Sequence, residues 1–287
     1  MRFRDLAQAR LATHALPTLD DVSALGALEE PPAPSRGRGV EISFVVPAHN
    51  EQALLPRTLA AIKSEIARVG CGAEIIVVDN ASTDGTAAIA GAVSGVVVVS
   101  EPQKGLSQAR QSGFLASSGR LVANIDADTI LPEGWLARVL REFEADPELV
   151  ALSGPYIYYD VPVHVRTITR VFYTIGWCTY AFNRFVLRVG SMLQGGNFVV
   201  TRAALNQIGG FDPAFTFYGE DTDAARRLHQ VGGVKFTFGL PAFSSGRRLA
   251  GDGLWATGMR YSVNYLWATF KHKPYTQTSR DYRDQNV

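Results

Sequence analysis

The feature that most constrains the fold is a repeated alternation, from residue 42 onward, of short β-branched runs with longer segments of helical composition. Continuous apolar runs are typical of strands that are covered on both faces, as in parallel sheets. The alternation therefore predicts an α/β fold with a mostly parallel, Rossmann-like sheet flanked by helices. The expected strands are ISFVV (42–46), EIIVV (74–78), VVVVS (96–100) and LVANI (121–125), and the expected helices are 51–69, 84–93 and 106–118.

The rest of the chain divides around this region. Residues 1–40 read as an N-terminal extension that ends in the Pro- and Gly-rich linker PPAPSRGRG, and residues 251–287 as a C-terminal helical tail. The 287 residues carry a net charge of +1, so no global field attracts nucleic acid. The sequence contains no run of about 18 uncharged apolar residues, which a membrane-spanning helix would need. Two cysteines fit a reducing compartment, so the expected location is cytoplasmic.

A polar segment follows each of the four expected strands, at the point where the strand ends. These segments are PAHNE (47–51), DNASTDGT (79–86), EPQKG (101–105) and DAD (126–128). In open α/β sheets the ligand crevice lies outside the carboxyl ends of the strands. We therefore expect the four segments to line one binding site.

The pair Asp126 and Asp128 is the strongest chemical signal among these segments. If the strand geometry continues, both carboxylates point to one side and Ala127 points to the other. Two neighbouring acids suit a hard cation such as Mg²⁺ or Mn²⁺, whose coordination is completed by substrate phosphates. The pattern alone is weak, because 221–223 (DTD) repeats it and a solvated strand end would produce it as well.

Six segments lie in a fixed order between about Ser43 and Phe238: VVPAHNE, VVDNASTDGT, KGLSQARQSGFLASSG, the DAD stretch, GGNFVVTRAALNQIGGFD and FYGEDTDAARRLHQVGG. Each segment alone is a motif of low specificity. In this order, together, they resemble the inverting family 2 glycosyltransferases, which have the GT-A nucleotide-diphospho-sugar fold. The resemblance implies a single GT-A domain over 41–250. Its nucleotide-binding half would be 41–130 and its acceptor-binding half 131–250.

The resemblance implies transfer of a sugar from a nucleotide-diphosphate donor to an acceptor hydroxyl, with Mg²⁺ or Mn²⁺ as cofactor. On the donor side it implies a base contact from Asp79, a ribose or metal contact from Asp126 and a metal contact from Asp128. For His49, Lys104 and Arg110, an ordinary loop or surface position is the alternative to the donor contact that the resemblance implies. The further donor-binding residues that the resemblance implies are Pro47, His49, Asn50, Glu51, Lys104 and Arg110.

On the acceptor side the resemblance implies that Asp221 is the general base and that Glu220 orients the acceptor or its partner. An acidic pair at a helix start would also arise from simple capping, so that alternative stays open. A glycan and a lipid-linked compound are both open as acceptors. The implied acceptor-binding residues are Gly195, Gly196, Asn197 and Tyr218.

One segment departs from the family pattern. Many related enzymes carry a histidine beyond the acidic pair as a further metal ligand, whereas PAFSSGRRLAGDG (241–253) contains none. Arg247 and Arg248 in this segment are candidates for bidentate contacts with the diphosphate. A surface loop is the alternative.

Two other functions share this chemistry. A sugar-phosphate nucleotidyltransferase has a related fold, but a Gly-rich, Arg-containing loop would be expected after the first strand, and PAHNE is not such a loop. A non-catalytic nucleotide-sugar-binding protein could keep the fold with a dead site. Retention of Asp79, Asp128 and Asp221 together argues against that alternative.

Residues 166–188 are not explained by any catalytic motif. On a helix, Ile168, Val171, Ile175, Phe182, Val186 and Val189 would share one side, which is expected to face the core. An opposite stripe would alternate arginine with aromatic residues, as interfacial helices do. The hypothesis is a peripheral association with the inner face of a membrane, which would bring a lipid-linked acceptor to the acidic pair. The stripe consists of Arg166, Arg170, Tyr173, Trp177, Tyr180, Arg184 and Arg188.

Overall fold

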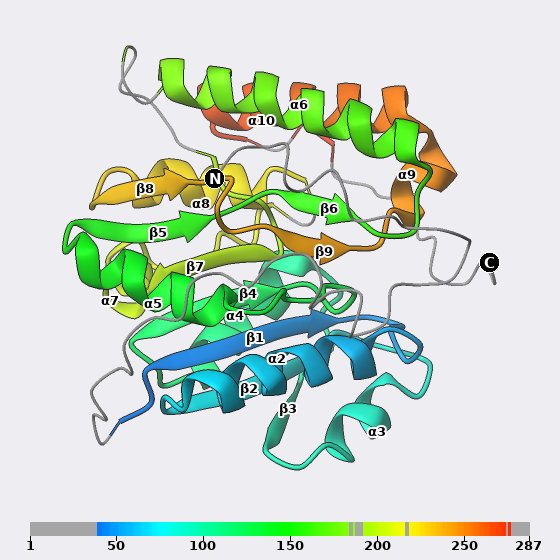
Figure 1. Cartoon of the computed structure of the whole chain (residues 1–287), viewed down its shortest axis with the longest axis vertical. Helices are drawn as coiled ribbons and strands as arrows, with labels where there is room; N and C mark the ends of the chain where they lie inside the picture. Colours follow the sequence, from blue (N-terminus) through cyan, green and yellow to red (C-terminus); the bar gives the residue numbers. More distant parts are fainter. Residues whose placement is uncertain (1–38, 184–185, 187–191, 216–217, 274, 277–287) are drawn as a thin grey trace.

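A computed structural model of the chain describes residues 39–183, 186, 192–215, 218–273 and 275–276 (Figure 1). The N-terminal extension expected at 1–40 thus lies almost wholly outside the described residues. The strands are β1 Ile42–Ala48, β2 Ala73–Asp79, β3 Val96–Ser100, β4 Leu121–Ile125, β5 Leu149–Ser153, β6 Tyr156–Tyr158, β7 Asn197–Thr201, β8 Gly233–Phe236 and β9 Ala242–Ser244. The helices are α2 Leu55–Val69, α3 Thr86–Gly91, α4 Leu106–Ala116, α5 Trp135–Ala145, α6 Val163–Phe182, α7 Arg202–Gln207, α8 Glu220–Leu228, α9 Arg247–Asp252 and α10 Leu254–Lys271.

The main sheet has the strand order β3-β2-β1-β4-β7-β5-β8. Neighbouring strands are parallel except at β7, which runs antiparallel to both β4 and β5. The expected α/β fold with a mostly parallel sheet is therefore confirmed. A second sheet consists of two parallel strands, β6 and β9, and a bridge between Phe243 of β9 and Ile130 joins it to the segment that follows β4.

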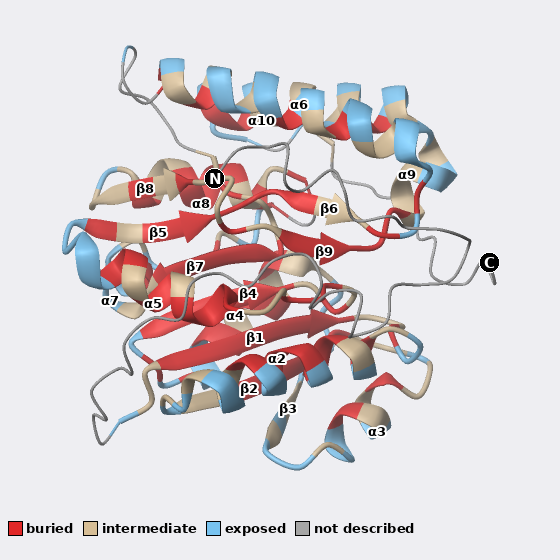
Figure 2. Ribbon diagram, in the orientation of Figure 1, coloured by how far each residue is buried: buried red, intermediate tan, exposed pale blue. Residues whose placement is uncertain are grey.

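Helices cover both faces of the main sheet, and the alternation of side chains along β1 shows how. Phe44 and Val46 pack into one core with α2 and α5, whereas Val45 packs into a second core with α4, α7 and α8. Every residue of β1 is buried, which explains why its sequence is apolar except for Ser43, whose hydroxyl donates a hydrogen bond to Glu74. Figure 2 shows the buried strands between helices whose outer sides are exposed.

Helix α6 turns a different side to the core from the one expected. Tyr173 and Tyr180 are buried against Phe236, with ring centroids 6.4 Å from it, and the Tyr180 hydroxyl donates a hydrogen bond to the carbonyl of Val234. The side that was expected to face the core is instead exposed, as at Val171 and Ile175. The predicted orientation was wrong because the two tyrosines of the stripe have polar partners inside the protein. Arg184, Arg188 and Val189 lie outside the described residues.

Candidate active site

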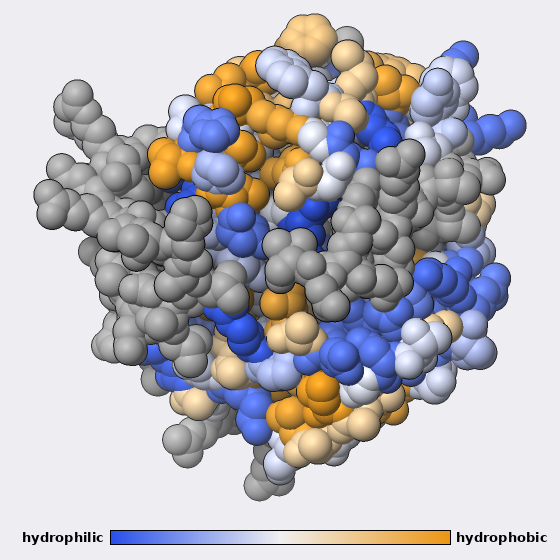
Figure 3. All heavy atoms as spheres, turned by 90° about the vertical axis from the view of Figure 1, so that its right-hand side faces the viewer, coloured by the Kyte–Doolittle hydropathy of each residue, from blue (hydrophilic) through white to orange (hydrophobic). Residues whose placement is uncertain are grey.

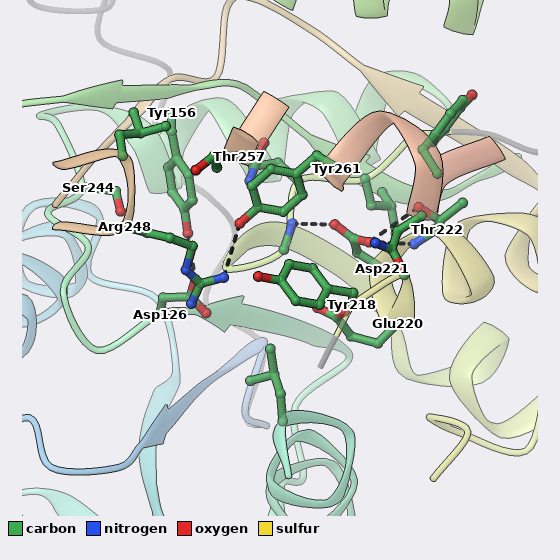
Figure 4. Close-up of a pocket in the computed structure, with 18 of the residues that line it drawn as sticks. Asp126, Tyr156, Tyr218, Glu220, Asp221, Thr222, Ser244, Arg248, Thr257 and Tyr261 are labelled. Carbon is green, nitrogen blue, oxygen red and sulfur yellow. Dashed lines mark hydrogen bonds between the residues drawn. The ribbon is translucent and has the colours of Figure 1, made fainter. Parts of the chain in front are cut away.

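A cavity of about 690 Å³ opens at the carboxyl edge of the main sheet (Figure 4). Its polar end is lined by the segments that follow β1, β2 and β4, together with the start of α4, the start of α8 and the residues around α9. The expected convergence of these segments on one site is therefore observed. The cavity continues from the acidic residues towards α6 and α10.

Hydrogen bonds hold the loops after β1 and β2 together. The Asn50 side chain accepts a bond from the backbone N–H of Thr83, and the N–H of Glu51 donates to the Thr86 hydroxyl. Asn50 and Ala81 both have a positive φ, of 52° and 57°. Such backbone is unfavourable for residues other than glycine and persists where the surroundings fix it, typically at binding sites. Asn50 thus shapes the loop with its own side chain.

Two basic side chains from different segments meet at the cavity: His49 follows β1 and Lys104 follows β3. His49 Nδ1 lies 2.8 Å from the carbonyl oxygen of Asn80, and His49 Nε2 lies 2.8 Å from Lys104 Nζ. Because a carbonyl only accepts, Nδ1 carries the hydrogen and Nε2 is the acceptor from Lys104. His49 therefore orients the Lys104 ammonium towards the cavity that both residues line.

Asp79 lies at the end of β2, where a base-binding acid was expected. One of its carboxylate oxygens, Oδ1, is buried and has no hydrogen-bond partner among the described residues. A buried polar atom without a partner is costly, so an unpaired carboxylate oxygen is a ready acceptor for the N–H of a ligand.

Asp126 belongs to a buried charge cluster centred on Arg110. The Arg110 side chain is fully buried and bonds to Glu220 at 2.9 Å and to Asp126 at 3.5 Å. The Tyr156 hydroxyl donates to the other Asp126 oxygen at 3.1 Å. Burial raises the pKa of Asp126, and Arg110 opposes that shift. Arg110 thus compensates the charge of acids contributed by β4 and α8.

Asp128 faces a different cation. A turn follows β4, in which the N–H of Thr129 bonds to the carbonyl of Asp126, so the strand geometry does not continue through the acidic pair. The Arg247 guanidinium lies 2.9 Å from Asp128 and 2.8 Å from Glu51. Both carboxylates of the pair still line the cavity, as expected, although each has its own basic partner.

The start of α8 positions Asp221. Its carboxylate accepts hydrogen bonds from the backbone N–H of Gly195 at 3.1 Å and from that of Thr222 at 2.7 Å. Burial raises the pKa of Asp221, against the opposing effects of Arg110 and of these two bonds. Burial, together with the neighbouring Asp221, also raises the pKa of Glu220 to about 8. Both acids line the cavity, and both have raised pKa values.

Gly195, Gly196 and Asn197 have three different environments. Gly195 lines the cavity beside Asp221. Gly196 has φ +79°, and a Cβ there would lie 2.0 Å from the Asp126 carboxyl carbon, so only glycine fits. Asn197 is fully buried, where its amide nitrogen bonds to the carbonyls of Gly154 and Leu240. Asn197 was expected to contact the acceptor, but its side chain lies in the core and bonds to the protein backbone instead.

Aromatic residues complete the site. Tyr218 packs edge-on against Tyr261, and the Arg248 guanidinium lies 5.9 Å from the centre of the Tyr218 ring and bonds to the Tyr261 hydroxyl at 3.1 Å. Figure 4 shows Arg248 directed towards Asp126. The sequence interpretation included Tyr218 and Arg248 but missed Tyr156 and Tyr261. The run YIYY at 156–159, which follows Gly154 and Pro155 after the end of β5, was the available signal for Tyr156.

Comparison with known sequences gives matches over the region of these motifs. The model for glycosyl transferase family 2 matches residues 43–209, and the model for the N-terminal domain of galactosyltransferase matches residues 182–242. An uncharacterized glycosyltransferase of Mycobacterium tuberculosis is 39% identical over 112 residues, which are 39% of this chain and 48% of that protein. An undecaprenyl-phosphate 4-deoxy-4-formamido-L-arabinose transferase of Aeromonas hydrophila is 31% identical over 106 residues, covering 35% of this chain and 32% of that one. The chain thus spans about half or less of the length of these relatives.

Solved structures with the same fold include two with bound nucleotide sugars. A mannosyltransferase from Pyrobaculum calidifontis, in complex with GDP-Man and Mn²⁺, aligns with a TM-score of 0.56 at 22% identity, covering 75% of this chain and 59% of that one. Glucosyl-3-phosphoglycerate synthase from Mycobacterium tuberculosis, in complex with Mn²⁺ and UDP-glucose, also has a TM-score of 0.56 at 22% identity, with coverage of 88% and 83%. At this level of sequence identity, both similarities show that the fold is shared.

Proposed function

Because the chain belongs to glycosyltransferase family 2, we propose that it transfers a sugar from a nucleotide-diphosphate donor to an acceptor hydroxyl, with inversion at the anomeric carbon. The observation that carries the proposal is the position of Asp221. Asp221 lines the same cavity as Lys104 and the pair Asp126 and Asp128. Asn80, the residue after Asp79, lines it as well. A donor bound across those residues would present its sugar to Asp221.

On the donor side, the unpaired Asp79 oxygen would accept a hydrogen bond from the base, and Lys104 would contact the phosphates. Pro47, near the end of β1, and the loop residues His49 and Glu51 line the same end of the cavity. Structural neighbours with this fold bind GDP-Man and UDP-glucose, which supports a nucleotide-sugar donor of either base class.

The carboxylates in the cavity suit a divalent metal ion, but few of them could act as its ligands. The carboxylates of Asp128 and Glu51 favour a cation at this position, which the Arg247 guanidinium occupies in the structure, so a metal ion would have to displace Arg247 from Asp128. No cluster of three or more His, Cys, Asp or Glu side chains that could hold a metal occurs in the described ranges. Mg²⁺ or Mn²⁺ would therefore be held by Asp128 and by phosphate oxygens of the donor, with Asp126 turned towards Arg110. Such an ion stabilises negative charge on a diphosphate leaving group.

This assignment predicts the metal dependence of nucleotide binding. A nucleoside diphosphate should bind more tightly with Mn²⁺ than without it, and Asp128→Ala should lose most of that increment, since the ion would have no carboxylate ligand from the protein. Titration calorimetry with UDP and GDP measures both quantities. Glu144→Ala, which removes an exposed acid on α5, is the control and should keep the increment. An unchanged increment in Asp128→Ala would place the metal elsewhere.

Asp221 would take the proton of the acceptor hydroxyl as the hydroxyl attacks the anomeric carbon. A general base is most effective when its pKa is near the operating pH, and burial moves the pKa of Asp221 in that direction. The bonds from Gly195 and Thr222 fix the orientation of the carboxylate. Glu220 is held against Arg110 and would position the acceptor side of the site.

The pKa shift predicts the pH dependence of the reaction. A base must be ionised, so kcat/KM should fall as the pH decreases through the raised pKa of Asp221. The acidic limb of the profile should therefore lie above the ordinary aspartate value of about 4. Initial rates measured between pH 4 and pH 9 at saturating Mn²⁺ give the profile. A limb at the ordinary value would mean that Asp221 is not buried as described or is not the base.

The acceptor class and the location concern the side of the cavity that contains Asp221. A glycan and a lipid-linked hydroxyl both fit the chemistry at Asp221, and an undecaprenyl-phosphate transferase among the relatives supports the lipid-linked class. Within the described ranges, no helix has both the length and the apolar character needed to cross a bilayer. We propose a cytoplasmic protein that associates peripherally with the inner face of a membrane.

A screen of nucleotide sugars tests the proposed function. Thermal shift with and without Mn²⁺ identifies the donor, and the product released from it distinguishes the alternatives. Release of a nucleoside diphosphate supports the transferase, release of pyrophosphate supports a nucleotidyltransferase, and binding without turnover supports a nucleotide-sugar-binding protein.

A further inference from the structure

The cavity that contains the acids has an apolar arm, which we call the apolar groove. It runs between α6 and α10 and is lined by Phe172, Ile175, Met192, Trp255, Met259 and Leu266. The two helices are connected near one end by a hydrogen bond of 2.9 Å between Asn183 and the Tyr265 hydroxyl. An opening lined in this way by hydrocarbon side chains suits a hydrocarbon ligand and has no use in binding a nucleotide.

Two glycines keep the groove wide. Gly176 in α6 and Gly258 in α10 both line it, although glycine is unfavourable in a helix interior. Neither is required by its surroundings: a Cβ at Gly176 would lie 3.7 Å from the Met192 side chain, and one at Gly258 would lie 3.7 Å from Phe172, which are ordinary contacts. Larger side chains at these positions would extend into the groove.

The surface around the groove is unusually apolar. Among the described residues, every exposed large hydrophobic side chain except Val97 and Leu115 belongs to the segments 163–186 and 255–275. Trp255 is the most exposed of them, at 84%. Figure 3 shows hydrophobic residues gathered over the upper part of the face, where α6 and α10 lie, above a polar hollow. A patch of this kind marks an interaction surface.

The charges on the two helices indicate what covers this surface. Neither α6 nor α10 contains an aspartate or a glutamate, whereas both carry basic residues: Arg166 and Arg170 on α6, and Lys271 and Arg260 on α10, of which Arg260 is paired with Asp252 at 2.9 Å. Tryptophan, tyrosine and basic residues around an apolar patch are the composition of a helix at a bilayer interface, where the basic residues meet anionic headgroups. A second copy of the chain would present the same positive charge and would be repelled.

A polar group lies where the groove meets the acids. Thr257 is 3% exposed and lines the cavity, and its hydroxyl has no hydrogen-bond partner within the described part of the chain. Figure 4 shows it beside Tyr261, on the α10 side of the acidic residues. A buried hydroxyl without a partner is a site for a polar ligand group, here at the inner end of an apolar channel.

We propose that the apolar groove holds the hydrocarbon chain of a membrane lipid whose hydroxyl headgroup is the sugar acceptor, and that the exposed side chains of α6 and α10 dock the protein on the bilayer that contains it. The inference rests on the proposed function, since it assigns the acceptor class of the same site. The chain lies between α6 and α10, Thr257 contacts the headgroup, and the acceptor hydroxyl reaches Asp221.

The docking surface is tested by sedimentation with vesicles of phosphatidylcholine alone and of phosphatidylcholine with phosphatidylglycerol. The wild-type protein should bind the anionic vesicles in a salt-sensitive manner, and Trp255→Asp should weaken binding by about tenfold or more. Leu115→Asp changes an equally apolar side chain, 71% exposed on α4, and should bind as the wild type does. Absence of vesicle binding, or equal loss in both variants, overturns the docking surface. So does a wild-type dimer in size-exclusion chromatography that Trp255→Asp dissociates.

The groove is tested with n-alkyl glucosides of increasing chain length, kept below their critical micelle concentrations and measured by calorimetry without a donor. Each methylene placed in the groove should increase affinity by up to about fourfold. Gly176→Leu should abolish this dependence on chain length, and Gly258→Leu provides the same test if the first variant does not fold. Gly91→Leu, at a helix position where a Cβ meets nothing within 4 Å, is the control. Equal chain-length dependence in the filled and wild-type proteins overturns the proposal.

The two proposals fail in different measurements. Binding of UDP and GDP with Mn²⁺ reports on the donor site and should be unchanged in Trp255→Asp and Gly176→Leu. If nucleotides bind and the glucosides do not, the acceptor class is wrong and the transferase stands. If the glucosides bind and no nucleotide does, the proposed function fails while the lipid groove remains.

Discussion

Replacing Asp221 by Asn should lower the rate of sugar transfer by about 10²- to 10⁴-fold, because the amide keeps the shape of the side chain but cannot take the proton of the acceptor. Donor affinity should change little, since the Asp221 carboxylate is held by the backbone N–H groups of Gly195 and Thr222. Initial-rate kinetics with the donor identified by thermal shift give kcat, and calorimetry gives the affinity for the nucleoside diphosphate.

Asp146→Asn is the matched control for this change. Asp146 is exposed beyond the end of α5 and accepts a bond from the N–H of Glu148, which asparagine preserves. Its kinetics should be those of the wild type. A parallel loss of donor affinity in Asp221→Asn would give Asp221 a role in binding the donor or metal, and wild-type turnover would exclude it as the base.

Replacing Arg110 by Met should reduce the free energy of unfolding by about 3–5 kcal/mol, the usual effect of removing one partner from a buried ion pair. Arg110 is fully buried between Glu220 and Asp126, and methionine would leave both acids without their cation. The pKa of each acid should then rise further in the folded protein. Glu220 has a pKa of about 8 in the wild type, so below that pH it is largely protonated in both proteins. Above it, Arg110 stabilises the ionised acid in the wild type alone, so the deficit should be smaller at pH 6 than at pH 9.

Urea denaturation at the two pH values measures this effect. Arg120→Met is the control, because Arg120 is 49% exposed and its pair with Glu41 should contribute less than about 1 kcal/mol. Equal, small losses in the two variants would show that Arg110 is not what compensates the buried acids. A large loss that does not depend on pH would attribute the effect to packing against Phe198, over which the Arg110 guanidinium lies.

The strands between residues 42 and 125 could be predicted closely from sequence. The strand expected at 42–46 is Ile42–Ala48, and the one expected at 121–125 is Leu121–Ile125. These strands are buried on both faces, so their apolar runs have sharp ends and leave little choice of structure. The convergence of the following loops is a consequence of parallel pairing, which the alternation with helices already implied.

The partners of individual side chains could not be predicted in this way. Arg247 bonds to Glu51 across 196 positions of sequence, and no local pattern encodes such a contact. The side of α6 that faces the core was misjudged for a related reason. Both sides of this helix are apolar enough to be buried, and the choice depends on partners for Tyr173 and Tyr180 that lie on β8 and in the residues around Gln194.

The single reversed strand, β7, has a consequence for how this protein can diverge. Because β7 runs antiparallel to β4, its first residues, and Gly196 just before them, lie beside the last residue of β4. Residues from the two halves of the chain therefore meet along one pair of strands, while the loops after β1 and β2 lie on one side of that seam and α6 and α10 on the other. If the donor binds at these loops and the acceptor between α6 and α10, as proposed, the two substrates are bound on opposite sides of the β4–β7 pair. Substitutions that change the specificity for one substrate would then leave the other side, and the pair of strands between them, unchanged.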